Sequence, residues 1–224
     1  MISTRVFSRQ RSIWANLAPT LEPVVRWANE NYTEFSDPVP ANGGEPANNA
    51  LIAEAAFGLV ASGRSWDSFS NADLRIVREY VLRVGEYPMP ATNLDAEELE
   101  EVRGLARSLG TNVSLMPTIE FWPEIPGCGV VDSARGDILS GLRLLEVKCV
   151  TRPFRSGDFR QLLTYCAMYA ASGVEIESVG IVNPRTGREI HLSVEFVCRG
   201  SSGLTSVEFF REVQRTMLEL QVSG

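Results

Sequence analysis

The chain has 224 residues, a formal net charge of −7 at pH 7, 44% hydrophobic residues and 22% charged residues. This composition is typical of an ordinary globular protein that is long enough to bury a full core, so no disulfide or metal is needed to hold the fold together. No apolar run approaches the roughly 20 residues of a membrane span and the N-terminus lacks a secretory signal pattern, so we expect a cytoplasmic protein.

The charge is unevenly distributed along the chain. Residues 1–127 carry 10 basic and 17 acidic side chains, whereas residues 128–224 carry 11 of each. The excess of acid therefore lies in the first part of the chain. Such a surface favours contact with a protein partner, or with a second copy of the chain, over contact with DNA.

The first 94 residues read as a helical extension. Residues 1–35 form a helical or irregular lead-in, and residues 37–46 are rich in turn-forming residues and should be an exposed loop. Amphipathic helices are expected over residues 48–61 and 71–84.

From residue 95 the pattern alternates between helix and strand. Asp95 can cap a helix that Gly110 would end. Two further helices are expected over residues 159–171 and 206–220. Short strands are expected over residues 113–121, 130–131, 137–139, 142–150, 176–182 and 191–197. This order predicts an α/β fold with a mixed central sheet that is flanked by helices.

Lys148 is the only lysine among 21 basic side chains. It lies in Glu146-Val147-Lys148, within an apolar run that predicts a central strand. Alternation along a strand places Glu146 and Lys148 on one face, while Val147 points into the core. Charged groups on a buried strand are costly unless they are paired or bound to a metal. An arginine could not replace this compact ammonium, because a guanidinium is broad, flat and always protonated.

Asp137 supplies another acid, nine residues before Glu146, where it leads into the preceding strand; in chain order it is the first acid of the site. Two carboxylates on adjacent strands and the backbone carbonyl of Val147 can hold Mg²⁺, which prefers hard oxygen ligands, and Mn²⁺ should substitute for it. Lys148 would then help to deprotonate or orient the attacking water, or stabilise charge on a phosphate. A plain Glu–Lys ion pair on an exposed strand is the alternative interpretation. Asp132 is a second candidate for the first acid.

The next helix adds polar residues to this group. Gln161 and Tyr165 are four residues apart and share a helix face, which could hold a water or a phosphate near the metal. A solvent-facing glutamine and an interfacial tyrosine are the alternative interpretation. Arg152, Arg155 and Arg160 cluster around the turn before and at the start of this helix, where they could bind phosphates or be ordinary loop charges.

The remaining polar candidates have simpler interpretations. Arg185 follows a proline and is expected to be a turn residue, although a loop over the site with Arg185 touching a phosphate is the alternative. His191, the only histidine, lies in an expected strand and is not expected to be a general base. The cysteines have wide, irregular spacings that favour reduced thiols over a zinc site: Cys128, Cys149, Cys166 and Cys198.

Together, these motifs resemble the PD-(D/E)XK nuclease superfamily, whose fold is restriction-endonuclease-like. The resemblance covers about residues 95–200, and its motifs are Gly136-Asp137, Glu146-Val147-Lys148 and the helix that contains Gln161 and Tyr165. That helix is similar to the one in RecB-like members. The resemblance implies a nuclease-like core over residues 95–224.

The resemblance also implies roles for these residues. Asp137 and Glu146 would bind Mg²⁺, Lys148 would be the catalytic lysine, and Gln161 and Tyr165 would be accessory. The activity would be that of a Mg²⁺-dependent endodeoxyribonuclease, in DNA processing or in bacterial defence against phage. A catalytically inactive scaffold or binding module with the same fold is the alternative.

Two positions depart from the family pattern. Gly136 precedes the first acid, where the family usually has a proline. Many members also carry a glutamate on the first core helix, and Glu54, Glu98 and Glu101 are all candidates for that position.

Overall fold

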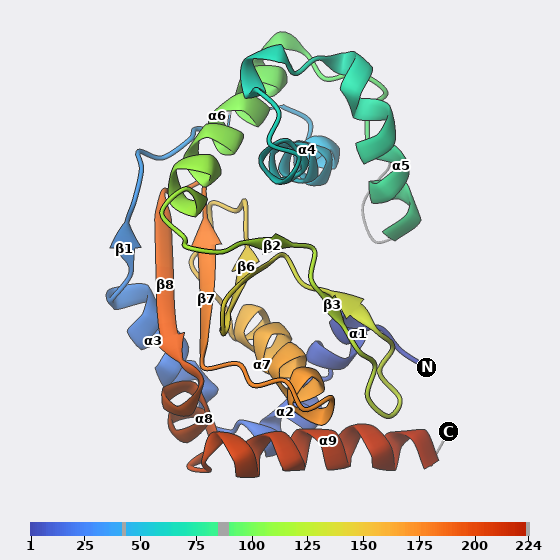
Figure 1. The fold of residues 1–224 in the computed structure, drawn as a ribbon, viewed down its shortest axis with the longest axis vertical. Coiled ribbons are helices and arrows are strands. Elements are labelled where there is room, and N and C mark those ends of the chain that lie inside the picture. The colour runs from blue at the N-terminus through green and yellow to red at the C-terminus, as the bar shows by residue number, and fades with distance from the viewer. Residues whose placement is uncertain (42–43, 85–89, 223–224) are drawn as a thin grey trace.

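The computed structural model describes residues 1–41, 44–84 and 90–222, and residues 42–43 of the expected loop lie outside this part (Figure 1). Its centre is a six-stranded sheet in the order β1-β8-β7-β6-β5-β2. The strands are β1 (Thr33–Glu34), β2 (Glu120–Phe121), β5 (Ile138–Ser140), β6 (Arg143–Val147), β7 (Ser178–Asn183) and β8 (Arg188–Ser193). Only the β6–β7 pair is parallel in this sheet. A separate antiparallel pair joins β3 (Glu124–Ile125) to β4 (Ala134–Arg135).

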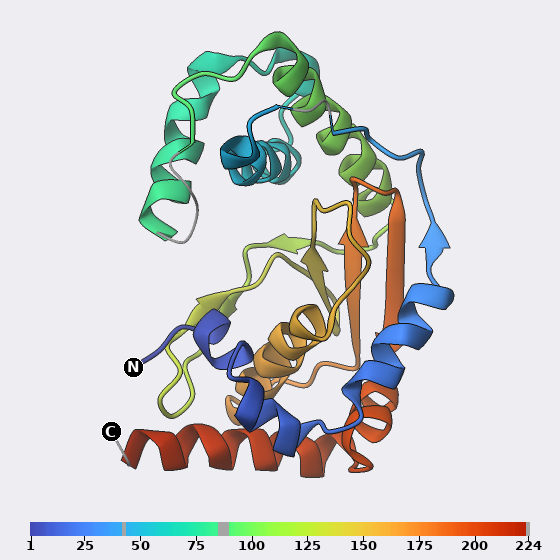
Figure 2. The same cartoon turned by 180° about the vertical axis from the view of Figure 1, so that it is seen from behind.

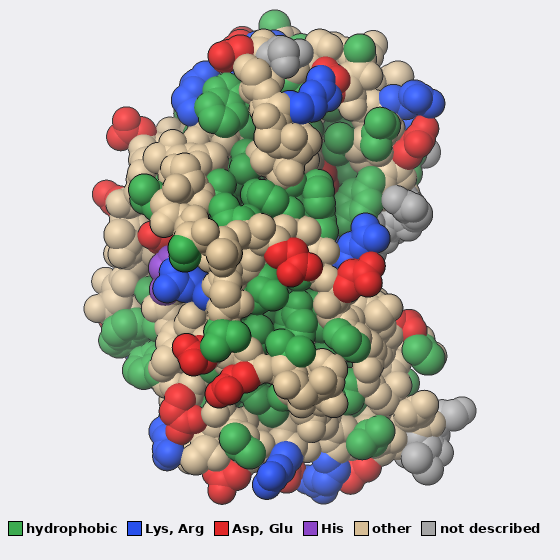
Figure 3. Space-filling model, viewed as in Figure 1, with side chains coloured by type: hydrophobic (Ala, Val, Ile, Leu, Met, Phe, Trp, Pro, Cys, Tyr) green, Lys and Arg blue, Asp and Glu red, His purple; other side chains and the backbone are tan. Residues whose placement is uncertain are grey.

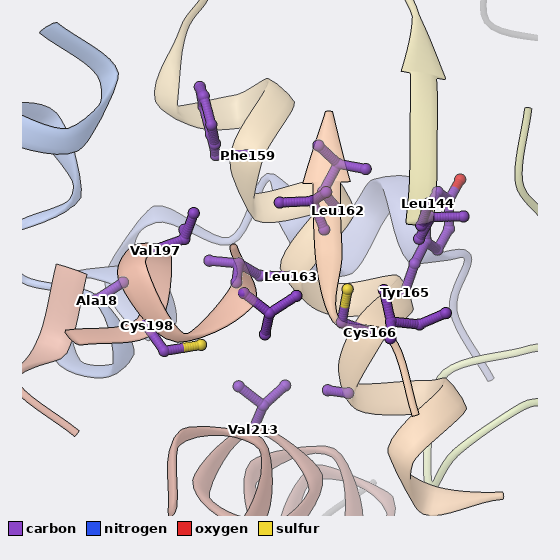
Figure 4. Packing of buried hydrophobic residues seen from close by; sticks show 14 of the residues in the cluster. Ala18, Leu144, Phe159, Leu162, Leu163, Tyr165, Cys166, Val197, Cys198 and Val213 are labelled. Atoms are coloured by element: carbon purple, nitrogen blue, oxygen red, sulfur yellow. The ribbon is translucent and has the colours of Figure 1, made fainter. Parts of the chain in front are cut away.

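One face of the sheet is covered by the crossover helix α7 (Ser156–Ala171), which connects the parallel strands β6 and β7. Figure 4 shows Leu162, Leu163 and Cys166 of α7 packed in this core. Five further helices complete this layer: α1 (Thr4–Ser8), α2 (Arg11–Leu17), α3 (Leu21–Glu30), α8 (Val194–Ser202) and α9 (Ser206–Val222).

The opposite face is covered by α4 (Asn49–Ala61) and α6 (Ala96–Val113), with α5 (Leu74–Val84) packed beside α4. Short 3₁₀ turns at Pro46–Asn48, Trp66–Ser68 and Asn71–Asp73 precede or connect these helices. Leu144 and Leu145 show how one strand serves both layers. Leu144 joins the cluster under α7, and the next residue, Leu145, joins the cluster under α4 and α6. The α/β class, with helices on both faces of a mixed sheet, is confirmed.

The helix expected after residue 94 begins as predicted but ends later. Asp95 accepts a hydrogen bond from the Glu98 amide at 2.8 Å and donates its own amide to the Glu98 carboxylate at 3.0 Å, which forms a capping box. Gly110 does not end the helix, because α6 continues to Val113. A Cβ at Gly110 would lie 3.1 Å from the Trp66 ring, so this glycine permits close packing inside the helix.

Three of the expected strands differ from those in the structure. Only Glu120–Phe121 of residues 113–121 is a strand, since α6 occupies the start of that range. Val130 and Val131 form no strand, and Val131 makes only isolated bridges to Ile2 and Cys128.

The third error is the strand expected over residues 191–197. Strand β8 ends at Ser193, whose hydroxyl caps α8 by accepting the Phe196 amide at 3.1 Å. Val194, Val197 and Cys198 are the buried apolar residues here, and a spacing of three and four is typical of a helix.

The first 94 residues, expected to form one helical extension, pack in two separate groups. The helices up to Glu30 share the hydrophobic cluster of α7 and α9, and β1 pairs with β8 at the edge of the sheet (Figure 2). Helices α4 and α5 instead pack with α6 in a second cluster. Within the described ranges, none of the helices is both long and apolar enough to cross a membrane.

Candidate active site

A cleft of about 1100 Å³ lies between α4 on one side and α1, α7 and the end of β6 on the other. Figure 2 shows these elements facing one another across the molecule. All the residues predicted for the site line this cleft: Asp137, Glu146, Val147, Lys148, Arg152, Arg155, Arg160, Gln161 and Tyr165. The fold therefore brings together side chains that are up to 28 residues apart in the sequence.

Asp137 is held directly against the strand that carries the other candidate residues. Its carboxylate oxygen Oδ2 accepts the backbone N–H of Val147 at 2.7 Å. The antiparallel β5–β6 pair makes this contact possible, because Asp137 directly precedes β5 and Val147 is the last residue of β6. The first acid thus lies beside the Glu146-Val147-Lys148 segment, as the spacing predicted.

Lys148 lies at the centre of a hydrogen-bonded chain. Its ammonium donates to Glu146 Oε1 at 2.7 Å and to Gln161 Oε1 at 3.1 Å. The Gln161 amide in turn donates to the Tyr165 hydroxyl at 2.9 Å. The backbone amide of Lys148 donates to the Val182 carbonyl at 2.9 Å and so continues the pairing of β6 with β7. Strand β6 and helix α7 together therefore fix the position of the ammonium.

Around Lys148, the carboxylates of Glu54, Asp137 and Glu146 concentrate negative charge that this one lysine only partly balances. Burial and the neighbouring Glu146 raise the pKa of Asp137 well above its usual value, although Lys148 opposes this effect. Burial alone would lower the pKa of Lys148, but Glu146 and Asp137 outweigh it and raise that pKa above the usual value. Lys148 is therefore a charged ammonium at neutral pH, suited to donating hydrogen bonds and balancing charge.

Of the three glutamates considered for the first core helix, Glu54 of α4 is the one that lines the cleft. Burial, followed by the charge of Glu146, raises the pKa of Glu54 to about 7. The remaining two have structural partners. Glu98 closes the cap of α6 and accepts the Asn48 amide at 2.8 Å, and Glu101 forms a buried ion pair with Arg185 at 2.5 Å.

Asp132, His191 and Arg185 lie away from the cleft lining. The backbone amide of Asp132 donates to the Ile2 carbonyl at 2.9 Å, so this rival for the first acid sits on a different segment of the fold. The Nε2 of His191 lies 2.8 Å from a Glu189 carboxylate oxygen. Arg185 is buried beside Glu101, as befits a structural residue.

The arginines at the mouth of the cleft differ in how they are held. Arg152 binds both oxygens of Asp158, at 2.7 and 2.9 Å, so it also stabilises the first turn of α7. Arg155 is exposed and Arg160 is half-buried. Sequence reasoning missed four further arginines that line the cleft: Arg5, Arg9, Arg11 and Arg135. Arg5 lies in α1, Arg11 in α2 and Arg9 between these helices. The overall acidic composition of the first part of the chain gave no indication of these arginines.

The donor set suits a hard divalent cation that keeps much of its water. Among the described residues, no three His, Cys, Asp or Glu side chains gather closely enough to form a complete metal cage. Mg²⁺ does not require such a cage, because it usually binds through one or two carboxylates and retains several waters. Asp137 and Glu146 supply two carboxylates. Burial, and after it the charge of Glu146, raises the pKa of both Asp137 and Glu54, and a cation would relieve the repulsion among these carboxylates.

Comparison with protein-family models and with curated proteins found no match for this chain. Its function is therefore inferred from the residues of the cleft and their geometry.

Proposed function

We propose that the chain is a Mg²⁺-dependent nuclease of the PD-(D/E)XK superfamily, of the RecB-like type, which hydrolyses phosphodiester bonds in DNA. The observation that carries the proposal is the open end of the β5–β6 hairpin, where the Asp137 carboxylate accepts the Val147 amide and the Lys148 ammonium donates to Glu146. Two acids and a lysine on adjacent strands, in a cleft with an arginine-rich mouth, match what phosphodiester hydrolysis requires.

Asp137, Glu146 and the Val147 carbonyl would hold the ion, which supplies Lewis-acid stabilisation of charge on the phosphate. The ammonium of Lys148 has three N–H donors, and Glu146 and Gln161 accept two of them. The third can donate to a phosphate oxygen, where charge develops during cleavage. Gln161 and Tyr165 hold the lysine in this position.

The cleft is more basic than the chain as a whole. Eight basic side chains line it, against five acidic ones: Arg5, Arg9, Arg11, Arg135, Lys148, Arg152, Arg155 and Arg160 against Glu22, Glu54, Asp137, Glu146 and Asp158. A protein with a net charge of −7 thus presents a local excess of positive charge at the site. Such an excess attracts phosphates and supports a nucleic acid as substrate.

A catalytically inactive scaffold with the same fold is the alternative. Crowded carboxylates and a nearby lysine are costly to keep in a half-buried cleft unless they serve a purpose, which favours the enzyme. A role in DNA processing or in defence against phage, in the cytoplasm and with a protein partner or a second copy of the chain, accompanies the nuclease proposal as its expected setting.

The proposal is tested by incubating the purified chain with plasmid, linear duplex and single-stranded DNA in Mg²⁺ or Mn²⁺. Wild type should cut at least one of these substrates, and Asp137→Ala and Lys148→Ala should not. Asp132→Ala is a matched control, because this acid is close in sequence but outside the cleft lining, and it should cut normally. Equal cleavage by all four proteins would refute the assignment of the site, and failure of wild type to cut any substrate would favour the scaffold.

A further inference from the structure

A second hollow of about 580 Å³ lies beside the cleft and shares Glu54, Tyr80 and Arg135 with it. Its walls are mainly apolar and come from α4, α5, the connection between them and the segment before β3, with these apolar side chains: Leu59, Phe69, Ile76, Val77 and Trp122. Figure 3 shows hydrophobic side chains gathered in the hollow between the α4–α5 helices and the sheet. The volume falls in the range of pockets that hold small organic groups.

Trp122 forms the aromatic wall of this hollow, directly next to the candidate active site. Its backbone amide donates to the Asp137 carbonyl at 2.9 Å, so the first acid and the indole are held by one backbone contact. Its ring packs edge-on against Phe57, with centroids 5.3 Å apart and planes at 73°. The side chain is nevertheless 38% exposed. The indole is therefore fixed in place by Phe57 and still presents surface to a ligand.

Trp122 also has a φ of 54°, and it is the only non-glycine residue with a positive φ in the described part of the chain. A bulky residue adopts this conformation only at a cost, which the surrounding contacts must offset. Here the Asp137 carbonyl and the Phe57 ring provide those contacts.

Gly58 keeps the α4 wall of the hollow open. It lies in the last turn of α4 and lines the hollow, and a Cβ added there would meet no atom within 4 Å. Glycine is less favourable than alanine inside a helix, and here no close packing demands it. The missing side chain leaves space that a ligand can occupy.

Arg135 joins the two hollows. It lines both of them, and its guanidinium lies 4.0 Å from Glu124 in a solvent-exposed pair. A second ion pair, Arg64 with Asp73 at 2.8 Å, borders the apolar hollow. The arrangement is thus an apolar, aromatic space with a cation at its junction with the basic cleft.

We propose that this hollow binds one unpaired nucleobase of the strand whose phosphate lies at Asp137 and Lys148. A base has a flat apolar face that stacks on an indole, and it is joined through its sugar to a phosphate that Arg135 can bind. A base within a duplex is stacked and paired, so it cannot enter. The inference rests on the proposed nuclease function and makes its substrate class more specific, namely a strand with at least one unpaired base.

The test measures binding of labelled DNA oligonucleotides by fluorescence anisotropy, with Ca²⁺ in place of Mg²⁺ and with strand integrity checked on a gel. A single strand is compared with its blunt duplex and with copies that carry one abasic site at successive positions. Wild type should prefer the single strand, and one abasic position should weaken binding about tenfold, which corresponds to 1.4 kcal/mol and to the loss of one stacked base.

Two variants remove the subsite by different routes. Trp122→Ala deletes the stacking surface, and Gly58→Phe fills the space from the α4 wall. Both should weaken single-strand binding about tenfold and abolish the penalty at the abasic position. Gly58→Ala fills less space and should have a smaller effect. Trp27→Ala is the matched control. Trp27 lies on α3, outside the lining of both hollows, is 41% exposed and packs on Phe196 with ring centroids 5.1 Å apart. This variant should keep the full abasic penalty.

The inference is overturned if every abasic position binds equally well, if the penalty persists in both Trp122→Ala and Gly58→Phe, or if wild type binds no single strand. It fails separately from the proposed function. A wild-type protein that shows the position-specific penalty but cuts no DNA in Mg²⁺ would support the base-binding site and refute the nuclease.

Discussion

At the scale of single residues, Lys148 is defined by its contacts. Its ammonium lies between Glu146 and Gln161, at 2.7 and 3.1 Å, directly after β6, in which Leu144 and Leu145 are buried. A guanidinium at this position would be broader, and its flat fork could not make both contacts from the same point. The geometry therefore explains why the one lysine of the chain lies here.

We expect that Lys148→Arg will not restore the function that Lys148→Ala removes. Each variant should reduce the single-turnover rate of DNA cleavage by about 100-fold or more, the loss typical when one donor to a developing charge is removed or misplaced. Thermal unfolding of both variants should first show that the fold is intact. A rate for Lys148→Arg within a few-fold of wild type would mean that only the positive charge matters.

Glu54 should make the metal-free protein less stable as the pH rises. Burial and Glu146 raise its pKa from 4.5 to about 7 in the folded state, so between these values the folded chain holds a proton that the unfolded chain has lost. Stability conferred by this proton is complete below about pH 4.5 and is lost by about pH 7, by up to about 3 kcal/mol. Asp137, whose pKa is also raised, adds a change of the same sign.

The measurement is urea unfolding of the metal-free protein at several pH values between 5 and 8. Glu54→Gln should be more stable than wild type at pH 8 and should show a shallower decline with pH. Glu79→Gln, which alters an exposed carboxylate 3.8 Å from Arg75, should follow wild type. A wild-type protein whose stability rises over this pH range would contradict the assignment.

The candidate site was predictable from the sequence where its residues are close together in the chain. Glu146 and Lys148 are fixed by strand alternation, and Gln161 and Tyr165 by helix spacing. Glu54 could not be chosen over Glu98 and Glu101, because that choice depends on which helix packs over the sheet at the cleft. Trp122 was missed for a similar reason, since its place beside Asp137 depends on the pairing of β2 with β5.

At the scale of elements, a buried ion pair links the α4–α6 layer to the sheet. Arg185, in the turn after β7, binds Glu101 of α6 at 2.5 Å, and both side chains are at most 4% exposed. Arg185 also donates to the Pro40 carbonyl at 3.3 Å. The pair holds α6 against the end of the strand that runs parallel to β6.

We expect Arg185→Met to destabilise the protein by about 3–5 kcal/mol, because it leaves the Glu101 carboxylate buried without its guanidinium. The double variant Arg185→Met with Glu101→Met should recover most of this loss. Urea unfolding measures both effects. Arg75→Met, which breaks an exposed pair with Glu79, should cost at most about 1 kcal/mol, and a similarly small cost for Arg185→Met would contradict the role of the buried pair.

Element boundaries were harder to predict than element types. The core order of α6, β5, β6, α7 and β7 follows the sequence pattern closely, because long apolar periodicities and an N-cap determine it. Gly110 was misjudged as a helix end because its packing against Trp66 is a long-range contact. The start of α8 was missed because Val194 and Phe196 fit an alternating pattern until Ser193 is seen to cap a helix.

At the scale of the whole molecule, the distribution of charge differs from what the sequence halves suggest. Arg5, Arg9 and Arg11 belong to the acidic first part of the chain, yet they line the same cleft as Arg155 and Arg160. The N-terminal helices carry them there by packing against α7 and α9. Under the proposed nuclease function, the N-terminal segment should therefore contribute to DNA binding.

We expect Arg9→Ala with Arg11→Ala to weaken DNA binding to a similar degree for every sequence, because contacts with phosphates carry no sequence information. Each phosphate contact that is lost should lower the slope of log K against log salt concentration by about 0.9, so the double variant should lower it by about 2. Titrations at several salt concentrations, with Ca²⁺ in place of Mg²⁺, give this slope. Arg211→Ala with Arg215→Ala removes the same charge from α9, outside the cleft lining, and should leave the slope unchanged. Equal slopes for both double variants would mean that the path of the strand does not cross the N-terminal helices.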